Sequence, residues 1–248
     1  MFIAKIRLDQ LLVDRGLVES RSKAQALIMA GLIFSKERKL EKAGQQVQPD
    51  IGLDVRGQDH PWASRGGLKL ARAIDEFDID PTDKTCIDVG ASTGGFTDVL
   101  IQNGATKVYA VDVGHGQLAW KLRSDERVIV LEKTNARYLT SDQIPDAPEI
   151  VVCDASFIGL RTVLPAAMAL AKPGATLAAL IKPQFEAGRE HVGKGGVVRD
   201  PEIHQRVCEE IRTWLGSLEG WSVVGITESP IKGPEGNIEF LIVAKKAL

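Results

Sequence analysis

The chain has 248 residues, a length that fits either one large domain or a large domain with a small one. Its hydrophobic fraction of 44% and charged fraction of 26% are ordinary for a globular protein and exclude a disordered, collagen-like or coiled-coil chain. The formal net charge of −2 is uneven, because residues 1–48 carry a net +4 and the rest of the chain carries −6. A basic segment ahead of an acidic body is the first indication of function.

Cysteine usage and hydrophobic patterning exclude several further classes of protein. The three dispersed cysteines, Cys86, Cys153 and Cys208, cannot form a disulfide framework, so we expect a reducing, cytoplasmic location. The most apolar stretch, Val163–Ile181, is interrupted by Lys-Pro-Gly, whereas a membrane span needs about 20 apolar residues, so we expect a helix and a buried strand there. The four histidines lack metal-ligand spacing, and we expect no metal.

The first 60 residues have the pattern of a small α+β unit. We expect a helix over residues 7–17, whose leucines share one face, and a second helix over Arg21–Ala30, capped by Ser20 and ended by Gly31. The expected strands are Leu32–Phe34, Gln46–Val47 and Leu53–Val55, with a charged turn at residues 36–39.

Two cations lie at the start of the second predicted helix, where the helix dipole favours anions. Arg21 and Lys23 occupy its first turn. A bound phosphate would account for them, because a helix N-terminus already attracts that group. The alternative is an ordinary solvated face.

A change of pattern at His60-Pro61-Trp62-Ala63 marks a boundary between two domains. Pro61 disfavours a helix at the residue before it, so an extended segment is expected here. We predict one domain over residues 1–59, a linker over 60–64 and a second domain over 65–248.

The second domain alternates predicted strands with predicted helices. This alternation indicates an α/β fold, with helices on both faces of a parallel sheet. The strands are Thr85–Val89, Lys107–Val113, Val128–Glu132, Ile150–Cys153 and Ala175–Ile181, and the helices lie near 96–103, 116–123, 160–171 and 200–215. Two further strands, Ser222–Thr227 and Ile238–Ala244, flank a Pro/Gly turn and predict an antiparallel pair at the sheet edge.

A glycine-rich loop, Asp88–Phe96, follows the first of these strands and opens a helix. Its glycines allow a tight turn and a close approach of the backbone to a ligand, but their spacing is neither GxGxxG nor that of a P-loop. Asp88 at the loop mouth suits a cationic group better than a diphosphate, and Asp112 at the end of the next strand suits a ribose diol. Together they favour S-adenosylmethionine over NAD, with a purely structural turn as the alternative.

Four ionisable residues adjoin apolar runs of the second domain. Asp154 and Lys182 directly follow strands, where ligand sites of open α/β sheets lie, while Lys69 precedes the first strand and Glu239 lies in the last. A buried cluster of two lysines and two carboxylates would stabilise a developing alkoxide. The alternatives are that Asp154 caps a helix and that Lys182 and Glu239 are ordinary surface ions.

A Gly-rich segment over residues 184–199 carries four basic side chains, Arg189, His191, Lys194 and Arg199. We expect either a loop that clamps phosphates beside the site or a merely solvated loop.

Taken in order, the motifs resemble the TlyA family along the whole chain. RLDQLLVDRGL and SRSKAQALIMAGLI resemble an S4-type RNA-binding domain. SRGGLKL, DVGASTGGFTDVL, VDVGHGQL, VVCDASFIGL, LIKPQFE and the terminal IEFLI resemble a catalytic domain of the FtsJ (RrmJ-like) class. The resemblance implies an α/β, Rossmann-like class I methyltransferase domain with a mixed seven-stranded sheet, preceded by a small α+β S4-like domain.

The resemblance also implies the site residues. The family's catalytic tetrad would fall on Lys69, Asp154, Lys182 and Glu239. Its S-adenosyl-L-methionine site would fall on Asp88, Gly90, Ala91, Ser92, Thr93, Gly94, Gly95, Phe96, Asp112 and Asn135. From the basic segments we expect RNA contacts at Arg7, Arg21, Lys23, Lys36, Arg38, Arg65, Arg189 and Lys194. Lys182 would assist deprotonation or stabilise the alkoxide, Asp154 and Lys69 would orient, and Glu239 would position Lys69 or the nucleotide.

The implied reaction is 2′-O-methylation of cytidine ribose in 23S ribosomal RNA, and in some members also in 16S RNA. Ribosomal RNA or a ribosomal subunit would be the partner, with no membrane and no metal. The short segment before Arg7 resembles the subtype that favours 23S RNA. A membrane-acting hemolysin, a non-catalytic RNA-binding protein and a nicotinamide-dependent oxidoreductase remain as alternatives, and the sequence does not predict the oligomeric state.

Overall fold

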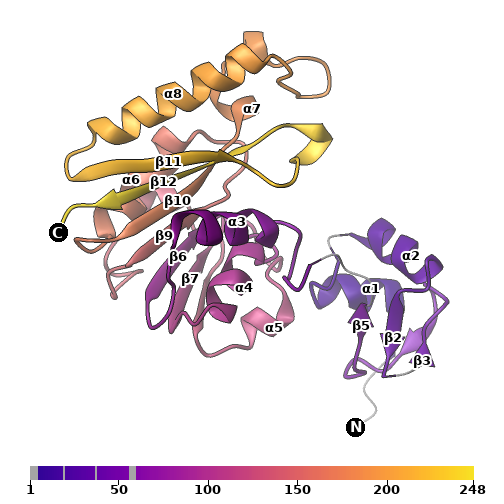
Figure 1. Cartoon of the computed structure of the whole chain (residues 1–248). Coiled ribbons are helices and arrows are strands. Elements are labelled where there is room, and N and C mark those ends of the chain that lie inside the picture. Colours follow the sequence, from indigo (N-terminus) through magenta and orange to yellow (C-terminus); the bar gives the residue numbers. More distant parts are fainter. Residues whose placement is uncertain (1–4, 19, 37, 56–59) are drawn as a thin grey trace.

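A computed structural model describes residues 5–18, 20–36, 38–55 and 60–248, which form a small and a large body joined by a short segment (Figure 1). The small body is built on a hydrophobic cluster that includes the fully buried Leu8, Leu12 and Ile33. Its elements are β1 (Ile6–Arg7), α1 (Leu8–Asp14), α2 (Arg21–Met29), β2 (Ile33–Ser35), β3 (Arg38–Lys39), β4 (Gln46–Val47) and β5 (Asp54–Val55).

Two expectations for the small body need correction and one is confirmed. The first helix is shorter than residues 7–17, because Arg7 belongs to β1 and Gly16 takes a left-handed φ of +63°. The charged turn contains strand β3, which pairs with β2 in an antiparallel ladder. The cap of α2 is confirmed, since the Lys23 backbone N–H donates to Ser20 Oγ at 3.2 Å.

The large body contains a mixed seven-stranded sheet in the order β11-β12-β10-β9-β6-β7-β8. Adjacent strands from β10 through β8 pair in parallel, as the alternating pattern predicts, and β11 pairs with β12 in an antiparallel ladder, as the C-terminal turn predicts. β12 also runs antiparallel to β10, its other neighbour, a pairing that the sequence did not predict. The strands are β6 (Thr85–Val89), β7 (Lys107–Val111), β8 (Val128–Leu131), β9 (Ile150–Cys153), β10 (Thr176–Ile181), β11 (Trp221–Glu228) and β12 (Phe240–Lys246).

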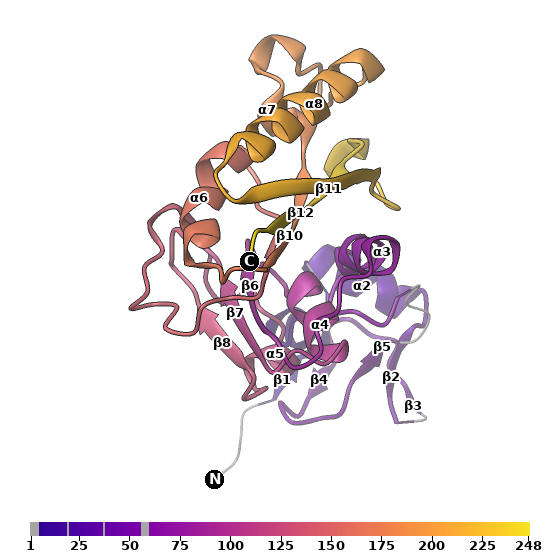
Figure 2. The same ribbon diagram turned by 60° about the vertical axis from the view of Figure 1, so that its left-hand side comes forward.

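Helices cover both faces of this sheet (Figure 2). One buried cluster joins one face to α6 (Leu160–Leu170) and α8 (Pro201–Ser217). A second cluster joins the other face to α3 (Gly67–Phe77), α4 (Gly95–Gln102) and α5 (Trp120–Arg123). The remaining elements are α7 (Pro183–Glu186) and the 3₁₀ turns Ala136–Tyr138, Arg189–His191 and Pro234–Gly236.

Two differences from the sequence-based expectations concern helices. The helix expected over 116–123 begins only at Trp120, because Gly116 has a φ of +70° and Ala119 is extended. The sequence reading placed no helix at α3, although Leu70, Ala73 and Phe77 recur with the helical period and face the core or pack against it.

This topology brings the four ionisable residues to one edge of the sheet. Asp154 follows β9 and Lys182 follows β10, so both lie at the carboxyl edge of parallel strands. Glu239 precedes β12, which is antiparallel, and therefore enters at that same edge. In the described part of the chain, no helix is both long enough and apolar enough to span a bilayer.

Candidate active site

A buried cluster of alternating charges lies at this edge. Lys69 Nζ lies 2.7 Å from Glu239 Oε2 and 3.4 Å from Asp154 Oδ2, and Lys182 Nζ lies 2.5 Å from Asp154 Oδ1. The exposed side-chain fractions are 8% for Lys69, 7% for Lys182, 19% for Asp154 and zero for Glu239. Two cations and two anions cancel, which offsets the cost of taking each charge out of water. The structure thus brings together all four expected catalytic residues, and they are not independent surface ions.

The Lys182 ammonium is fixed in direction. Its Nζ contacts the Asp154 carboxylate, donates to the Asp154 backbone carbonyl at 3.1 Å and donates to Ser156 Oγ at 2.9 Å. An ammonium has three N–H donors, and two of them are used by the hydrogen bonds to the Asp154 carbonyl and to Ser156, while the contact with Asp154 Oδ1 is an ion pair. The Ser156 residue is exposed, so its hydroxyl is the contact that an incoming hydroxyl group would most easily replace.

Glu239 is held on its other side by two less obvious neighbours. Gln184 Nε2 donates to Glu239 Oε1 at 3.5 Å. A Cβ atom added at Gly233 would lie 2.2 Å from Glu239 Oε1, so only glycine leaves room for the carboxylate here. Arg65 Nη2 donates to the carbonyl of Lys232, next to this glycine, at 3.3 Å.

Two cavities meet at this cluster and share a wall. The first, here the cofactor cavity, has a volume of about 380 Å³ and is lined mainly by residues that follow β6, β7, β8 and β9. The second, here the catalytic cavity, has about 280 Å³ and includes Lys69, Lys182 and Gly233 in its lining. Residues common to both are Gly90, Ser92, Asp154 and Ser156.

The glycine loop runs between these cavities in a backbone conformation that requires glycine. Gly90 has a φ of +85°, and a Cβ atom there would lie 2.8 Å from Ala155 Cα. Gly94 has a φ of +95°, and a Cβ atom there would lie 2.3 Å from Leu122 Cδ1. The loop residues Ala91, Ser92, Thr93, Gly95 and Phe96 line the catalytic cavity.

The cofactor cavity combines two carboxylates, Asp112 and the shared Asp154, with apolar walls. Asp112 Oδ2 accepts from the Ser92 backbone N–H at 2.8 Å and Oδ1 accepts from the Gly114 N–H at 2.6 Å, which orients the carboxylate in the cavity wall. Asn135 also lines the cavity, while its side chain caps the following 3₁₀ turn by accepting from Arg137 N–H. Val111, Val113, Ala136 and Ile158 supply apolar surface.

Asp88 lies beneath the loop, not at its mouth. Its side chain is fully buried and lines neither cavity, and Thr97 Oγ1 donates to its Oδ2 at 2.7 Å. Its Oδ1 is buried without a hydrogen-bond partner in the described structure. Burial raises the pKa of Asp88 to about 7, despite the hydrogen bond from Thr97. Asp88 therefore supports the loop from below, and a direct contact with a ligand stays a prediction.

In the small body, two of the expected RNA-binding arginines converge on one buried carboxylate. Arg7 forms two hydrogen bonds with Asp9, at 3.0 and 2.8 Å, and Arg21 Nη2 donates to Asp9 Oδ2 at 3.1 Å. Gln25 Nε2 donates to the same oxygen. The Arg7 guanidinium holds the pKa of Asp9 well below its usual range, while both arginines stay about half exposed. The anionic partner of Arg21, in the first turn of α2, is thus the Asp9 carboxylate of the protein itself.

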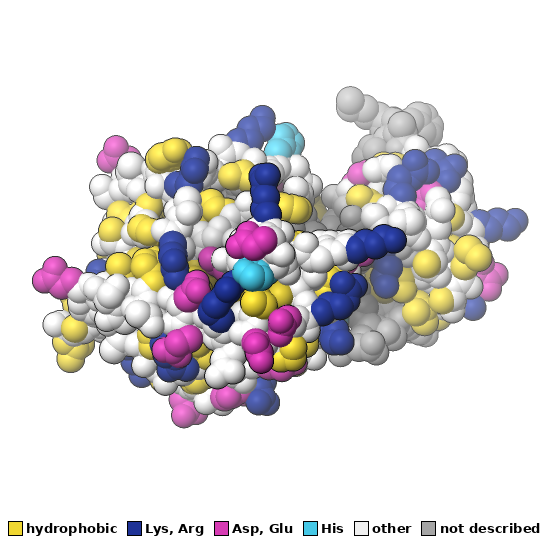
Figure 3. All heavy atoms as spheres, turned by 90° about the horizontal axis from the view of Figure 1, so that it is seen from above, with side chains coloured by type: hydrophobic (Ala, Val, Ile, Leu, Met, Phe, Trp, Pro, Cys, Tyr) yellow, Lys and Arg dark blue, Asp and Glu magenta, His cyan; other side chains and the backbone are white. Residues whose placement is uncertain are grey.

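The other expected RNA-binding residues are exposed, and Figure 3 shows Lys and Arg side chains on both bodies and where the two meet. These residues are Lys23, Lys36, Arg38, Arg65, Arg189 and Lys194. Arg65 also lines the catalytic cavity. The segment 188–199 is attached to the chain ahead of β12, since Asn237 accepts from Val198 N–H and donates to the Gly196 carbonyl.

The sequence reading missed three residues that belong to the site. Ser156 contacts Lys182 and lines both cavities. Gln117 lines the cofactor cavity, and its Oε1 accepts from Ser92 Oγ at 3.3 Å. Phe157 lies at the cavity rim, 90% exposed and with a left-handed φ of +65°. The sequence offered one indication of Phe157 and Ser156, because both lie within three residues of Asp154 in the segment CDASF. Within the described ranges, no three His, Cys, Asp or Glu side chains are placed to hold a metal ion.

Comparisons with known proteins identify a family for each part of the chain. The family model for FtsJ-like methyltransferases matches residues 62–246, and the model for S4 domains matches residues 6–50. A Bacillus subtilis relative, provisionally named the rRNA methyltransferase YqxC, is 52% identical over 96% of this chain and 85% of its own length. The Mycobacterium tuberculosis protein named 16S/23S rRNA (cytidine-2′-O)-methyltransferase TlyA is 45% identical over 96% of this chain and 89% of its own length. A solved structure from Streptococcus thermophilus, provisionally named a hemolysin, has a TM-score of 0.75 and 43% identity over 99% of this chain and 90% of that one.

Proposed function

This chain belongs to the family of FtsJ-like methyltransferases, and from that premise we propose that it methylates the 2′-hydroxyl of cytidine in ribosomal RNA, with S-adenosylmethionine as the methyl donor. The observation that carries the proposal is the cluster of Lys69, Asp154, Lys182 and Glu239 beside the glycine loop. Family membership excludes the nicotinamide-dependent oxidoreductase, and the intact cluster argues against a non-catalytic protein.

The cofactor cavity fits S-adenosylmethionine in size and chemistry. Its volume of about 380 Å³ is in the range of small-molecule sites, about 300–1,000 Å³. Asp112 would bind the ribose hydroxyls, the apolar residues would contact the adenine, and the backbone of Gly90–Gly94 would approach the methionine part. When bound, the cofactor supplies a methyl group on a cationic sulfur.

The chain's own residues orient the acceptor hydroxyl and stabilise its charge. A ribose 2′-OH in the catalytic cavity would replace Ser156 as the third partner of Lys182 Nζ. The ammonium would then lie against the oxygen where negative charge develops as the hydroxyl proton passes to water at the open side of the catalytic cavity. Asp154 fixes Lys182, and Glu239 and Asp154 together fix Lys69, so that no reorientation is needed during transfer.

The small body supports RNA as the substrate. We propose that residues 1–59 form an RNA-binding domain, that 60–64 link it to the catalytic domain over 65–248, and that both domains contact phosphates through the exposed cations named above. The TlyA name of the Mycobacterium tuberculosis relative supports cytidine in 16S or 23S RNA as the target. An enzyme of this class would act on ribosomal RNA in the cytoplasm, which agrees with three free cysteines.

The test is single-turnover methyl transfer to 23S rRNA by Lys182→Ala. We expect a loss of about 100- to 1,000-fold, the cost of removing one group that stabilises a developing oxyanion. Lys172→Ala is the matched control, because Lys172 pairs with Glu149 on the surface at 3.5 Å and is half exposed. A Lys182→Ala rate near that of the wild type, with folding and cofactor binding intact, would remove Lys182 from the mechanism. Mapping the ribose methyl groups on rRNA from a deletion strain would identify the nucleotide.

A further inference from the structure

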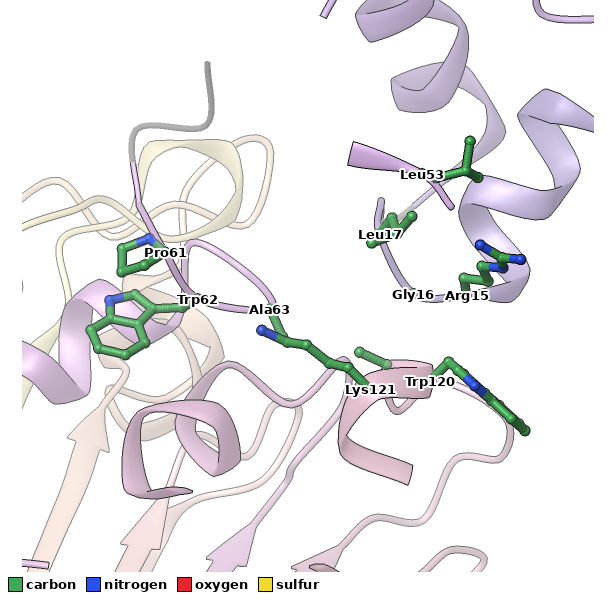
Figure 4. Close-up of a pocket in the computed structure, with 10 residues that line it drawn as sticks. Arg15, Gly16, Leu17, Leu53, Pro61, Trp62, Ala63, Trp120 and Lys121 are labelled. Atoms are coloured by element: carbon green, nitrogen blue, oxygen red, sulfur yellow. The ribbon is translucent and has the colours of Figure 1, made fainter. Parts of the chain in front are cut away.

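A third cavity, of about 200 Å³, lies between the two bodies (Figure 4). Its lining comes from residues 15–17 and Leu53 of the small body, residues 61–63 of the linker and residues 119–121 at the start of α5. We call this cavity the interdomain notch. No step of the proposed reaction uses it.

The notch is formed by direct contact of the two bodies. The Trp120 backbone N–H donates to the Arg15 carbonyl at 3.2 Å. A Cβ atom at Gly16, which has a φ of +63°, would lie 2.5 Å from Ala119 Cα, so the small body approaches α5 through a glycine. The notch is therefore bounded by residues of both bodies that contact each other directly.

The notch combines an exposed aromatic ring with apolar and cationic side chains. Trp120 is 59% exposed, which is unusual for the largest aromatic side chain. In Figure 4 its indole points away from Ala63, while Lys121 points toward Ala63. Leu17 and Leu53 add apolar surface.

The charge of the notch is positive. The Arg15 guanidinium donates to the carbonyls of Pro49 and Ile51, and in the described structure it pairs with no carboxylate. Lys121 pairs with Asp98 at 2.6 Å and remains half exposed. A cation fixed by neutral carbonyls keeps its charge available for a phosphate.

The notch adjoins the catalytic cavity at two points. Ala63 lines the notch, and the next residue, Ser64, lines the catalytic cavity. Ala119 lines the notch, and its N–H donates at 3.1 Å to the carbonyl of Thr93, which lines the catalytic cavity. An RNA strand that ran from the small body to the catalytic cavity along these residues would pass the notch.

We propose that the interdomain notch binds an unpaired nucleotide of the RNA substrate, with its base stacked on Trp120 and its phosphate near Arg15. This inference rests on the proposed function. Single-stranded RNA is bound by this combination of aromatic face and nearby cation, since every base has a face that stacks. The volume of about 200 Å³ is below the usual range for a drug-sized ligand, about 300 Å³ and more, and favours one base.

The experiment compares three substitutions of one residue, Trp120→Phe, Trp120→Leu and Trp120→Ala, in the full chain. The readout is the dissociation constant for 23S rRNA transcribed in vitro, with calorimetric titration of S-adenosylmethionine as the check that the cofactor site is intact. We expect Trp120→Leu and Trp120→Ala to bind RNA about 5- to 100-fold more weakly, the loss of one base stack, and Trp120→Phe to stay within about threefold of the wild type. RNA should also quench the tryptophan fluorescence of the wild type more than that of Trp120→Phe.

The leucine variant separates stacking from packing. If Trp120→Leu binds RNA as well as Trp120→Phe, the ring only fills space and the proposal is wrong. The proposal also fails if Trp120→Ala binds RNA like the wild type. Should the wild type methylate 23S rRNA while every Trp120 variant binds it normally, this inference falls and the proposed function stands. A wild type that neither binds nor methylates 23S rRNA would overturn both.

Discussion

Replacing Asp154 by asparagine is expected to destabilise the fold as well as abolish methyl transfer. Asp154 is the carboxylate that contacts both Lys69 and Lys182, so the substitution changes the net charge of the buried cluster from zero to +1. Breaking a buried ion pair by removing one partner costs about 3–5 kcal/mol of unfolding free energy. Because the Asp154 side chain is itself 19% exposed, we expect the lower end of this range, about 3 kcal/mol.

This cost is measurable by thermal unfolding. For a domain of this size, 1 kcal/mol corresponds to about 2–4 °C in Tm, so a decrease of roughly 6–12 °C is expected. Asp146→Asn is the matched control, since Asp146 pairs with Lys107 at 2.7 Å but is half exposed, and such pairs contribute about 0–1 kcal/mol.

A second substitution tests the reason for the effect. In Asp154→Asn combined with Lys182→Met, the remaining Lys69 and Glu239 again form a neutral pair, so the double variant should be more stable than Asp154→Asn alone. If Asp154→Asn loses no more stability than Asp146→Asn, the reasoning from a charge-balanced buried cluster is refuted. The same holds if removing the Lys182 charge restores nothing.

Three further predictions concern the loop, the buried acid and the basic surface. Gly90→Ala should weaken S-adenosylmethionine binding at least about tenfold by calorimetry, because left-handed strain of about 1–2 kcal/mol adds to the clash with Ala155. The control is Gly236→Ala, where φ is +88° and the space around the glycine is open. This variant has the same strain without the clash and should bind the cofactor like the wild type. The pKa of Asp88 is raised to about 7, so its contribution to stability is present at acidic pH and is lost as the pH rises to about 7. The urea midpoint of the wild type should therefore decline over this pH range relative to the midpoint of Asp88→Asn. Parallel curves of midpoint against pH for the two proteins would contradict this. Lys23→Ala should lower the slope of log affinity for rRNA against log salt by about 1, and an unchanged slope would exclude a phosphate contact there.

The carboxyl-edge residues of the site were predictable, whereas their partners were harder to place. Asp154 and Lys182 follow apolar strands, and the rule that ligand sites lie beyond the carboxyl ends of parallel strands locates both. Lys69 comes from α3, a helix that was not predicted because the pair of glycines in SRGGLKL is unfavourable for a helix. The apolar period of Leu70, Ala73 and Phe77 nevertheless predicts a helix there. Glu239 reaches the site only because β12 runs antiparallel beside β10, a pairing that the local sequence does not encode.

Burial and precise element length were the least predictable features. Asp88 ends a strand at the expected place, yet whether its carboxyl points into a cavity or beneath the loop depends on the packing of Thr97 in α4. The shortened α5 depends on the left-handed conformation of Gly116 and on the contact of Ala119 with the small body, neither of which has a periodic signal.

The shared carboxylate of Asp9 has a thermodynamic consequence for binding. Arg7 lies on β1 and Arg21 on α2, and one inaccessible acid already holds both side chains. Ordering a long side chain at an interface ordinarily costs about 0.5–1.5 kcal/mol, so if Arg7 and Arg21 bind a polyanion as predicted, their prior order would reduce the free-energy cost of binding by about 1–3 kcal/mol. Since Asp9 belongs to the small body itself, this advantage would accompany residues 5–55 if they were fused to a different catalytic domain.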